Sequence, residues 1–187
     1  MFQEKGFTLI EHERSKSLRR NEGFTLIELI VVIGIIAFLT ALILPNYRQG
    51  QESFALQRSA TKLAQDLRRA QEMAMSAEEF QACATNPKYK YGYGIHLKKI
   101  EPDHYVLFAD CNGNGDYDFG WDEIVEDINF EKDVKISKLS KTSLRITFTP
   151  PDPTVSIKPN PPAWIELSIN TSSKIIRVNT AGLISVE

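Results

Sequence analysis

The sequence GFTLIEL at residues 23–29 opens an apolar run that ends at Leu44-Pro45. From Phe24 to Leu44 there are 21 residues, and Glu28 is the only one that carries a charge. About 20 apolar residues in helical form cross the hydrocarbon core of a bilayer. A soluble helix of this length would show a polar stripe at the helical period, and this run shows none. We therefore expect a membrane-spanning helix over residues 24–44.

Glu28 is the unusual residue of this run. A charge at the centre of a membrane helix costs about 2.5–3.5 kcal/mol on insertion scales, so it is normally kept for a purpose. If the chain were cut between Gly23 and Phe24, the new ammonium at Phe24 and the Glu28 carboxylate would be opposite charges near one helix end. They could pair within one chain or between neighbouring chains and set the register of packed helices. The alternative is that Glu28 merely extends to the lipid headgroups.

The hexapeptide GFTLIE followed by an apolar helix resembles the class III signal of type IV pilins and type II secretion pseudopilins. In that family a membrane prepilin peptidase cuts after the glycine and methylates the new N-terminal phenylalanine. The resemblance implies that Gly23 ends the leader, that Phe24 is the methylated N-terminus and that Glu28 is the assembly carboxylate. Pro45 stands where the family commonly has a proline that kinks the helix.

Residues 1–23 would then be the prepilin leader. Residues 6–11 repeat GFTLIE, but charged residues follow this copy instead of an apolar helix. We interpret it as a local duplication without its own function. Four basic residues between Arg14 and Arg20 favour retention of the leader on the cytoplasmic side. We therefore expect a single-pass inner-membrane protein with a periplasmic C-terminal domain, which later enters a pilus or pseudopilus. A conventional secretory signal would place its cleavage site after the apolar region.

Charge and length limit the possible partners. The 187-residue chain carries a net charge of −2, and removing residues 1–23 leaves 17 basic and 20 acidic residues. This mild acidity gives no bulk electrostatic reason to bind nucleic acid, and residues 179–187 contain no basic side chain. Nucleic acid is thus an unlikely partner. The roughly 140 residues beyond the apolar run suffice for one modest core.

A second helical segment follows Pro45. Apolar residues recur at spacings of three and four from Phe54 to Ala74, and charged residues fill much of the rest. We expect an amphipathic continuation of the helix over residues 45–80, with its helical pattern reaching about Ala77. The basic group Arg58, Lys62, Arg68 and Arg69 is interpreted as a solvated face, with a ligand-binding patch as the alternative.

The pattern changes to short runs rich in aromatic and β-branched residues from Tyr89 onward. The expected strands are residues 91–100, 104–109, 124–130, 134–139, 144–149, 164–170 and 174–178. The proline clusters at 150–153 and 159–162 are expected in an exposed loop. The predicted fold class is α+β and pilin-like: a long N-terminal helix, transmembrane in its first half and amphipathic in its second, packs on antiparallel sheet within a β-rich domain of residues 81–187.

A finer resemblance concerns the GspH/FimT group of minor pseudopilins. LAQDLRRAQEMA at residues 63–74 is similar to the helix of that group, although Gln71 stands where the group usually has arginine. The pattern Phe108-Ala109-Asp110-x-Asn112-Gly113-x-Gly115 and the late Gly182 are similar to it as well.

Residues 110–118, DCNGNGDYD, form the best candidate site away from the membrane. Oxygen side chains at alternate positions followed by glycine at the sixth resemble the start of an EF-hand calcium loop. The candidate calcium ligands are Asp110, Asn112, Asn114, Asp116 and Asp118. The closing glutamate is absent because Trp121 occupies the twelfth position. The alternative is an ordinary turn between strands, for which Asn-Gly is common.

Cys83 and Cys111 both follow the apolar run, and their separation fits no C-x-x-C metal pair. In an oxidising compartment they could form a disulfide, and two buried thiols are the alternative. His96 and His104 are interpreted as strand residues near the sheet surface, without a neighbouring pattern that suggests a triad or a metal site. No phosphate loop, zinc spacing or Gly-x-Ser-x-Gly occurs, so we expect no enzyme.

Together these patterns predict a minor pseudopilin or pilin subunit that polymerises through its N-terminal helix after leader cleavage and methylation. The alternatives are a major pilin, or a membrane-anchored periplasmic binding or enzymatic domain that never polymerises, including one for DNA uptake. The resemblance implies a prepilin peptidase, other pilins and an inner-membrane assembly platform as partners, with membrane lipid around the apolar helix.

Overall fold

The computed structural model describes residues 23–187 apart from 77–79, 81–82, 84–91, 132 and 151–154. Within helix α1 the side chains of residues 44–49 also lie outside the described part. The upstream repeat at residues 6–11 falls outside the described residues. The chain divides into two compact units between Ile43 and Leu44, and we describe each unit by itself.

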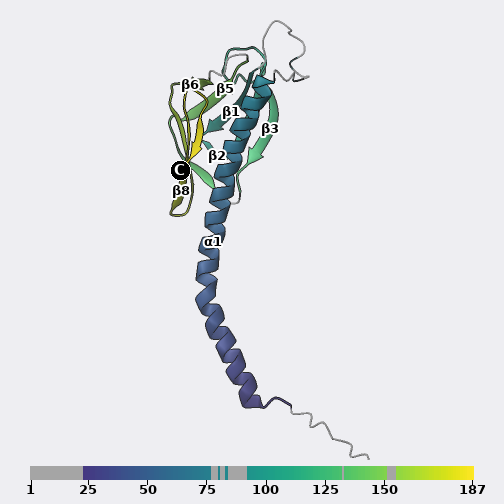
Figure 1. The fold of residues 1–187 in the computed structure, drawn as a ribbon, viewed down its shortest axis with the longest axis vertical. Coiled ribbons are helices and arrows are strands. Elements are labelled where there is room, and N and C mark those ends of the chain that lie inside the picture. Colours follow the sequence, from purple (N-terminus) through teal and green to yellow (C-terminus); the bar gives the residue numbers. More distant parts are fainter. Residues whose placement is uncertain (1–22, 77–79, 81–82, 84–91, 132, 151–154) are drawn as a thin grey trace, which may run out of the picture. The chain divides into compact units, whose positions relative to one another are not determined.

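Helix α1 (Leu26–Met75) contains both helical segments expected from the sequence (Figure 1). Its first part, Leu26–Ile43, is long and apolar enough to span a membrane, and every residue of it is exposed in the single chain. Pro45 lies inside α1, so the helix continues past the proline. The helix ends at Met75, two residues before the predicted limit at Ala77.

The second unit places one stripe of α1 in a hydrophobic core. The buried residues of this stripe recur at three- and four-residue spacings, as the sequence pattern predicts. They are Leu56, Ala60, Leu63, Ala64, Leu67, Ala70 and Ala74. Four of these seven side chains are alanine, and such small side chains permit the helix to pack closely on the β-strands.

Two antiparallel sheets complete this unit. The five-stranded sheet has the order β3-β2-β1-β5-β6, and the four-stranded sheet has the order β4-β7-β8-β9. The strands of the first sheet are β1 (Gly92–Lys98), β2 (Glu101–Asp110), β3 (Glu123–Asn129), β5 (Ser143–Phe148) and β6 (Val155–Lys158). Those of the second are β4 (Lys135–Leu139), β7 (Ala163–Ile169), β8 (Ser172–Val178) and β9 (Ile184–Val186). This arrangement confirms the α+β, pilin-like fold class.

The two faces of the five-stranded sheet bury different side chains. The pair Ile95 and Leu107 lies on the face toward α1, where Tyr105 donates a hydrogen bond from its hydroxyl to Asp66 of the helix. The pair Gly94 and Phe108 lies on the opposite face, because neighbouring residues of a strand point to opposite sides. Phe108 is buried there outside the main core cluster. Something other than the helix must therefore cover this second face.

Strands β6 and β9 are absent from the sequence prediction. β6 has only four residues, between a proline cluster at residues 150–153 and another at residues 159–162. β9 has three residues at the C-terminus. Runs this short carry too little alternation to separate a strand from a loop. Residues 159–162 are exposed, as expected for the second proline cluster.

Candidate functional site

The first predicted site is the start of α1, where Gly23 and Phe24 precede the helix and are exposed, the Phe24 side chain to 85%. The backbone N–H of Glu28 donates to Thr25 Oγ1 at 3.2 Å, and the N–H of Leu29 donates to the Thr25 carbonyl at 3.2 Å. Thr25 is therefore the N-cap of the helix, and Glu28 is three residues further on. This spacing is that of a capping box, in which a threonine cap is followed by glutamate or glutamine.

Glu28 also lies in the first turn of α1, a position that the sequence reasoning did not use. A carboxylate in the first turn is favoured by the partial positive charge at a helix N-terminus, by about 0.3–1 kcal/mol. Helix capping and the predicted role in assembly depend on different properties of the Glu28 side chain. Capping needs a hydrogen-bond acceptor, which glutamine retains, whereas pairing with an ammonium needs the charge.

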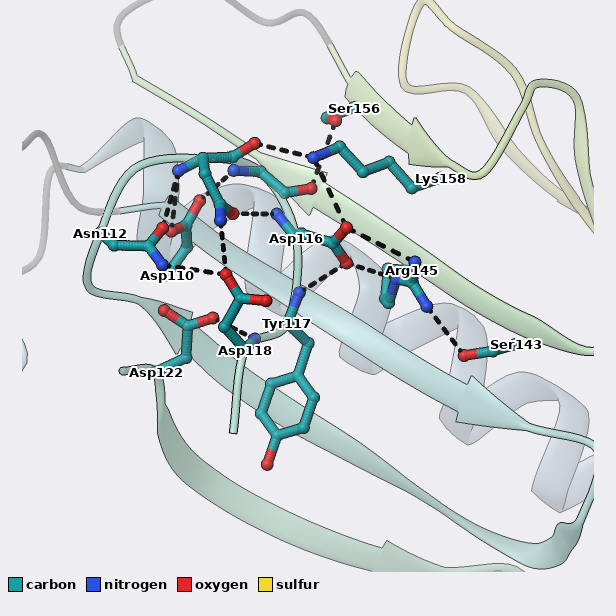
Figure 2. A network of polar contacts seen from close by, with 12 residues as sticks. Asp110, Asn112, Asp116, Tyr117, Asp118, Asp122, Ser143, Arg145, Ser156 and Lys158 are labelled. Carbon is teal, nitrogen blue, oxygen red and sulfur yellow. Dashed lines mark hydrogen bonds and ion pairs between the residues drawn. The ribbon is translucent and has the colours of Figure 1, made fainter. Parts of the chain in front are cut away.

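The second predicted site is the loop between β2 and β3, residues 111–122, which covers the face of the five-stranded sheet opposite α1 (Figure 2). Asp110, the last residue of β2, is fully buried and accepts hydrogen bonds from the backbone N–H groups of Gly113, Asn114 and Gly115 at 2.6–3.2 Å. Burial raises the pKa of the Asp110 carboxyl, and these three hydrogen bonds act in the opposite direction.

The other acidic residues of the loop are also held by local donors. Asp122 accepts the N–H groups of Cys111 at 3.0 Å and Asp118 at 2.7 Å, which joins the two ends of the loop. Asp118 accepts the side-chain amides of Asn112 at 3.1 Å and Asn114 at 2.5 Å. The loop is thus closed by its own hydrogen bonds, like an Asx-rich turn.

Asp116 fastens the loop to the neighbouring strands. Its carboxylate forms an ion pair with Arg145 of β5, and Lys158 of β6 lies 3.6 Å from it. Lys158 also donates to the Asn114 carbonyl at 2.9 Å, and Ser156 Oγ donates to the Gly115 carbonyl at 3.3 Å. Figure 2 shows these contacts reaching from the loop to both strands.

Tyr117 fills the space between the loop and the sheet. Its ring lies 4.8 Å from the His96 ring and 5.1 Å from the Phe108 ring, centroid to centroid. His96 is consequently buried, although the sequence placed it near the sheet surface. Burial, together with the positive charges of Lys98 and Arg145, lowers the pKa of His96 from 6.5 to about 4.

His96 and its polar neighbours hydrogen-bond to one another and hold the sheet together. His96 Nε2 lies 3.0 Å from Ser143 Oγ, and Arg145 donates to the same oxygen at 3.0 Å. A neutral imidazole nitrogen accepts the serine proton, while the serine oxygen accepts from the guanidinium. His104 of β2 makes a different contact, 3.1 Å from the side chain of Asp103.

Cys83 and Cys111 form a disulfide with a Cα–Cα distance of 5.2 Å. This connection is the first of the two alternatives that the sequence left open. It links the start of the loop to the segment that follows α1. A cross-link of this sequence separation, 28 residues, restricts the unfolded chain and adds to the contacts that hold the loop.

In the structure, the five predicted calcium ligands form hydrogen bonds and ion pairs with the protein itself. The side-chain oxygens of Asn112 and Asn114 accept backbone N–H groups, and the three aspartates face N–H or cationic donors. Among the described residues, no group of three His, Cys, Asp or Glu side chains could hold a metal ion. The physical reason is that donors already occupy the oxygens, while the bidentate glutamate that completes such a loop is missing.

Two of the four residues of the basic group on α1 form ion pairs. Arg58 makes a two-point contact with Glu131 at 2.6 and 2.7 Å, and Arg69 contacts Glu126 at 2.7 Å. Arg68 makes a long contact of 3.5 Å to the Ile184 carbonyl. These residues are exposed and join the helix to the sheet, which accords with a solvated face.

Sequence reasoning missed two structural contacts, Tyr105–Asp66 and Arg145–Asp116. Asp66 lies within the charged pattern of the helix, so its burial has no local signal. Arg145 follows Leu144 in an alternating strand pattern and reads as an ordinary solvent-facing residue. The partners are 39 and 29 residues apart in the chain, and only the fold brings them together.

Comparison with protein families gives two matches. The model for the prokaryotic N-terminal methylation motif matches residues 18–44. The model for the type II transport protein GspH matches residues 59–182, which is more than half of the chain. Comparisons with curated proteins and with solved structures give no match.

Proposed function

The chain belongs to the GspH family of type II transport proteins, and from this premise we propose that it is a minor pseudopilin that polymerises through α1 into a type II secretion pseudopilus or type IV pilus. The apolar part of α1 carries the proposal. Residues Leu26–Ile43 are all exposed in the single chain, and Glu28 is their only charge. Such a surface needs lipid before assembly and neighbouring apolar helices after it.

Maturation would begin at the methylation motif, residues 18–44. Residues 1–23 would be removed as the leader by a prepilin peptidase, which would cut after Gly23 and methylate Phe24. Both residues are exposed beside the helix start, as a protease requires. Residues 24–44 would remain in the membrane, residues 45–80 would continue the helix, and residues 81–187 would form the β-rich domain.

The family is structural rather than catalytic, and we extend this to the present chain. The apolar helix and the prepilin signal indicate an inner-membrane anchor with a soluble C-terminal domain. We place that domain in the periplasm because the basic residues of the leader lie on the other side of the helix. The inferred partners are other pilins, an inner-membrane assembly platform and the prepilin peptidase.

The experiment separates the charge of Glu28 from the hydrogen-bonding capacity of a side chain at this position. The full-length chain is expressed in a host with a prepilin peptidase and an assembly system, and sheared filaments are compared with membranes. Glu28→Gln keeps a hydrogen-bond acceptor at this position and loses the charge. Thr25→Ala loses the cap and keeps the charge, while Thr25→Ser is the matched control that retains both.

We expect Glu28→Gln to stay in the membrane and Thr25→Ser to enter filaments like the parent chain. Thr25→Ala should retain assembly, at reduced yield, because a lost cap costs only about 1 kcal/mol. Mass analysis of the membrane fraction should show each variant beginning at N-methylated Phe24. An uncut parent chain, or one that is cut but absent from filaments, would refute polymerisation and favour a simple membrane anchor.

A further inference from the structure

The loop between β2 and β3 ends in a turn with two exposed aromatic side chains. Phe119 is 92% exposed and Trp121 is 73% exposed. The N–H groups of Trp121 and Asp122 donate to the Asp118 carbonyl at 3.1 and 3.0 Å, which closes the turn. Gly120 has a φ of 92°, a value that favours glycine at the third position of such a turn. The turn therefore holds both aromatic residues away from the sheet.

The base of this turn is fixed on the sheet. Asp116 pairs with Arg145 (Figure 2). Tyr117 packs on Phe108, and Asp122 closes the loop through two N–H groups. Two large apolar side chains are thus presented on a support that is already ordered. An ordered support lowers the entropy lost when an exposed aromatic residue binds a partner.

A third apolar residue extends the surface. Ile124 of β3 is exposed, and together with Phe119 it borders a hollow of about 330 Å³ on the same side of the sheet. Tyr117, Asp127, Lys98 and His104 also line this hollow. We call Phe119, Trp121 and Ile124 the aromatic tip. In protein–protein interfaces, a few large aromatic residues that fit into pockets often carry most of the binding energy.

The segment that carries the aromatic tip is acidic, and Lys98, which also lines the hollow, is paired with Glu101 at 3.1 Å. Residues 116–127 contain six carboxylates and no lysine or arginine. Asp116 and Glu126 are paired with Arg145 and Arg69. Glu123 and Asp127 are exposed and form no ion pair within the described part of the chain. These two carboxylates disfavour an anionic lipid surface or a nucleic acid and favour a partner with basic residues.

We propose that the aromatic tip is the docking surface for a neighbouring pilin-type subunit whose receiving face is an apolar pocket bordered by lysine or arginine. The proposal rests on the proposed function and names one contact of that assembly. The tip and α1 lie on opposite faces of the five-stranded sheet, as the Tyr105 and Phe108 contacts show. A second subunit can therefore reach the tip while α1 remains packed on its own domain.

The test uses the full-length chain in a host that assembles it into filaments. The tip variant carries Phe119→Ser and Trp121→Ser. The matched control is Ile100→Ser, which removes a residue that is 83% exposed in the turn between β1 and β2. We expect filament incorporation of the tip variant to fall about ten-fold or more, as for loss of a binding hot spot, and the control to assemble like the parent chain.

The receiving face is identified with a photoreactive probe, p-benzoylphenylalanine, in place of Trp121. We expect a cross-link to the globular domain of a pilin-type subunit beside lysine or arginine residues. Glu123→Lys should lower the yield of this cross-link several-fold, because it places a positive charge beside the basic border. Thermal unfolding of the tip variant should match that of the parent chain, since both side chains are exposed.

Three results would overturn the proposal. One is normal incorporation of the tip variant, a second is a cross-link only to lipid or to a protein outside the filament, and the third is an absent cross-link in assembled filaments. In each case a parent chain that is cleaved and assembled leaves the proposed function standing. A parent chain that does not assemble removes both proposals together.

Discussion

The contact between Tyr105 and Asp66 offers the sharpest test of how α1 is held on the sheet. The Tyr105 hydroxyl donates to the Asp66 carboxylate, and both side chains are buried. Tyr105→Phe removes the hydroxyl without changing the ring, so it creates no cavity. The substitution leaves the Asp66 carboxylate without its only described side-chain donor.

The size of the effect follows from the surroundings. A hydrogen bond to a charged acceptor contributes about 1.5–3 kcal/mol to the free energy of unfolding. Asp66 also lines a hollow of about 660 Å³ beside Arg58 and Lys62, through which water can reach the carboxylate once the hydroxyl is gone. We therefore expect Tyr105→Phe to lower the free energy of unfolding by about 2 kcal/mol, near the middle of that range. For a unit of this size the unfolding midpoint should fall by roughly 5–10 °C.

The assay is thermal unfolding of the full-length chain in mild detergent, followed by circular dichroism. Asp66→Asn is the companion variant, because its amide oxygen can still accept from Tyr105. Asp66→Asn should lower the free energy of unfolding by only about 1 kcal/mol, and the double variant should show a coupling of at least about 0.5 kcal/mol. The contact would not hold the helix on the sheet if Tyr105→Phe changed the free energy of unfolding by less than about 0.5 kcal/mol. The same conclusion would follow if the effects of the two single variants simply added in the double variant.

The same pair predicts a pH dependence. Burial raises the pKa of Tyr105 above its usual 10.0, and the hydrogen bond and charge of Asp66 raise it further. Because the folded-state pKa exceeds the unfolded value, this contribution to stability is complete below pH 10.0 and declines as the pH rises above it. Tyr105→Phe should reduce the alkaline decline of the unfolding midpoint, and an unchanged decline would argue against the burial of the phenol.

Two further predictions concern the face of the sheet under the loop. Gly94→Ala should lower the free energy of unfolding by roughly 3 kcal/mol, since its Cβ would lie 2.7 Å from both the Ile146 carbonyl oxygen and the Phe108 ring. Gly50→Ala, with no neighbour within 4 Å, should instead be neutral or stabilising in urea unfolding. The pKa of His96 is lowered from 6.5 to about 4, so its contribution to stability is present above pH 6.5 and is lost as the pH falls toward 4. NMR titration should find the His96 ring still neutral at pH 5.5, and a midpoint near 6.5 would show that the loop leaves the ring exposed.

The sequence alone determined the fold class and the family, because both depend on local patterns. The apolar run behind GFTLIEL predicted the first part of α1, and the three-and-four spacing from Leu56 to Ala74 predicted its buried stripe. Most strands were also predicted from short runs rich in aromatic and β-branched residues. The family matches at residues 18–44 and 59–182 bear out the resemblance to pseudopilins of the GspH/FimT kind.

The contacts of the loop of residues 111–122 could not be predicted from the sequence. Its alternating oxygen side chains fit a calcium loop and a hydrogen-bonded turn equally well, because both use the same residue types. Only the placement of Arg145 and Lys158 on neighbouring strands shows that Asp116 has cationic partners. The burial of His96 likewise depends on Tyr117, which lies 21 residues away in the chain.

Local patterns therefore decided the secondary structure of this protein, while the tertiary structure decided the partners of its charged and aromatic side chains. A helix or strand is selected by the spacing of residues within one segment, and the sequence displays that spacing directly. An ion pair or ring contact depends on distances between segments. Those distances exist only once α1, the two sheets and the loop have packed, which is why the exposed Phe119 and Trp121 became visible as a surface only in the folded chain.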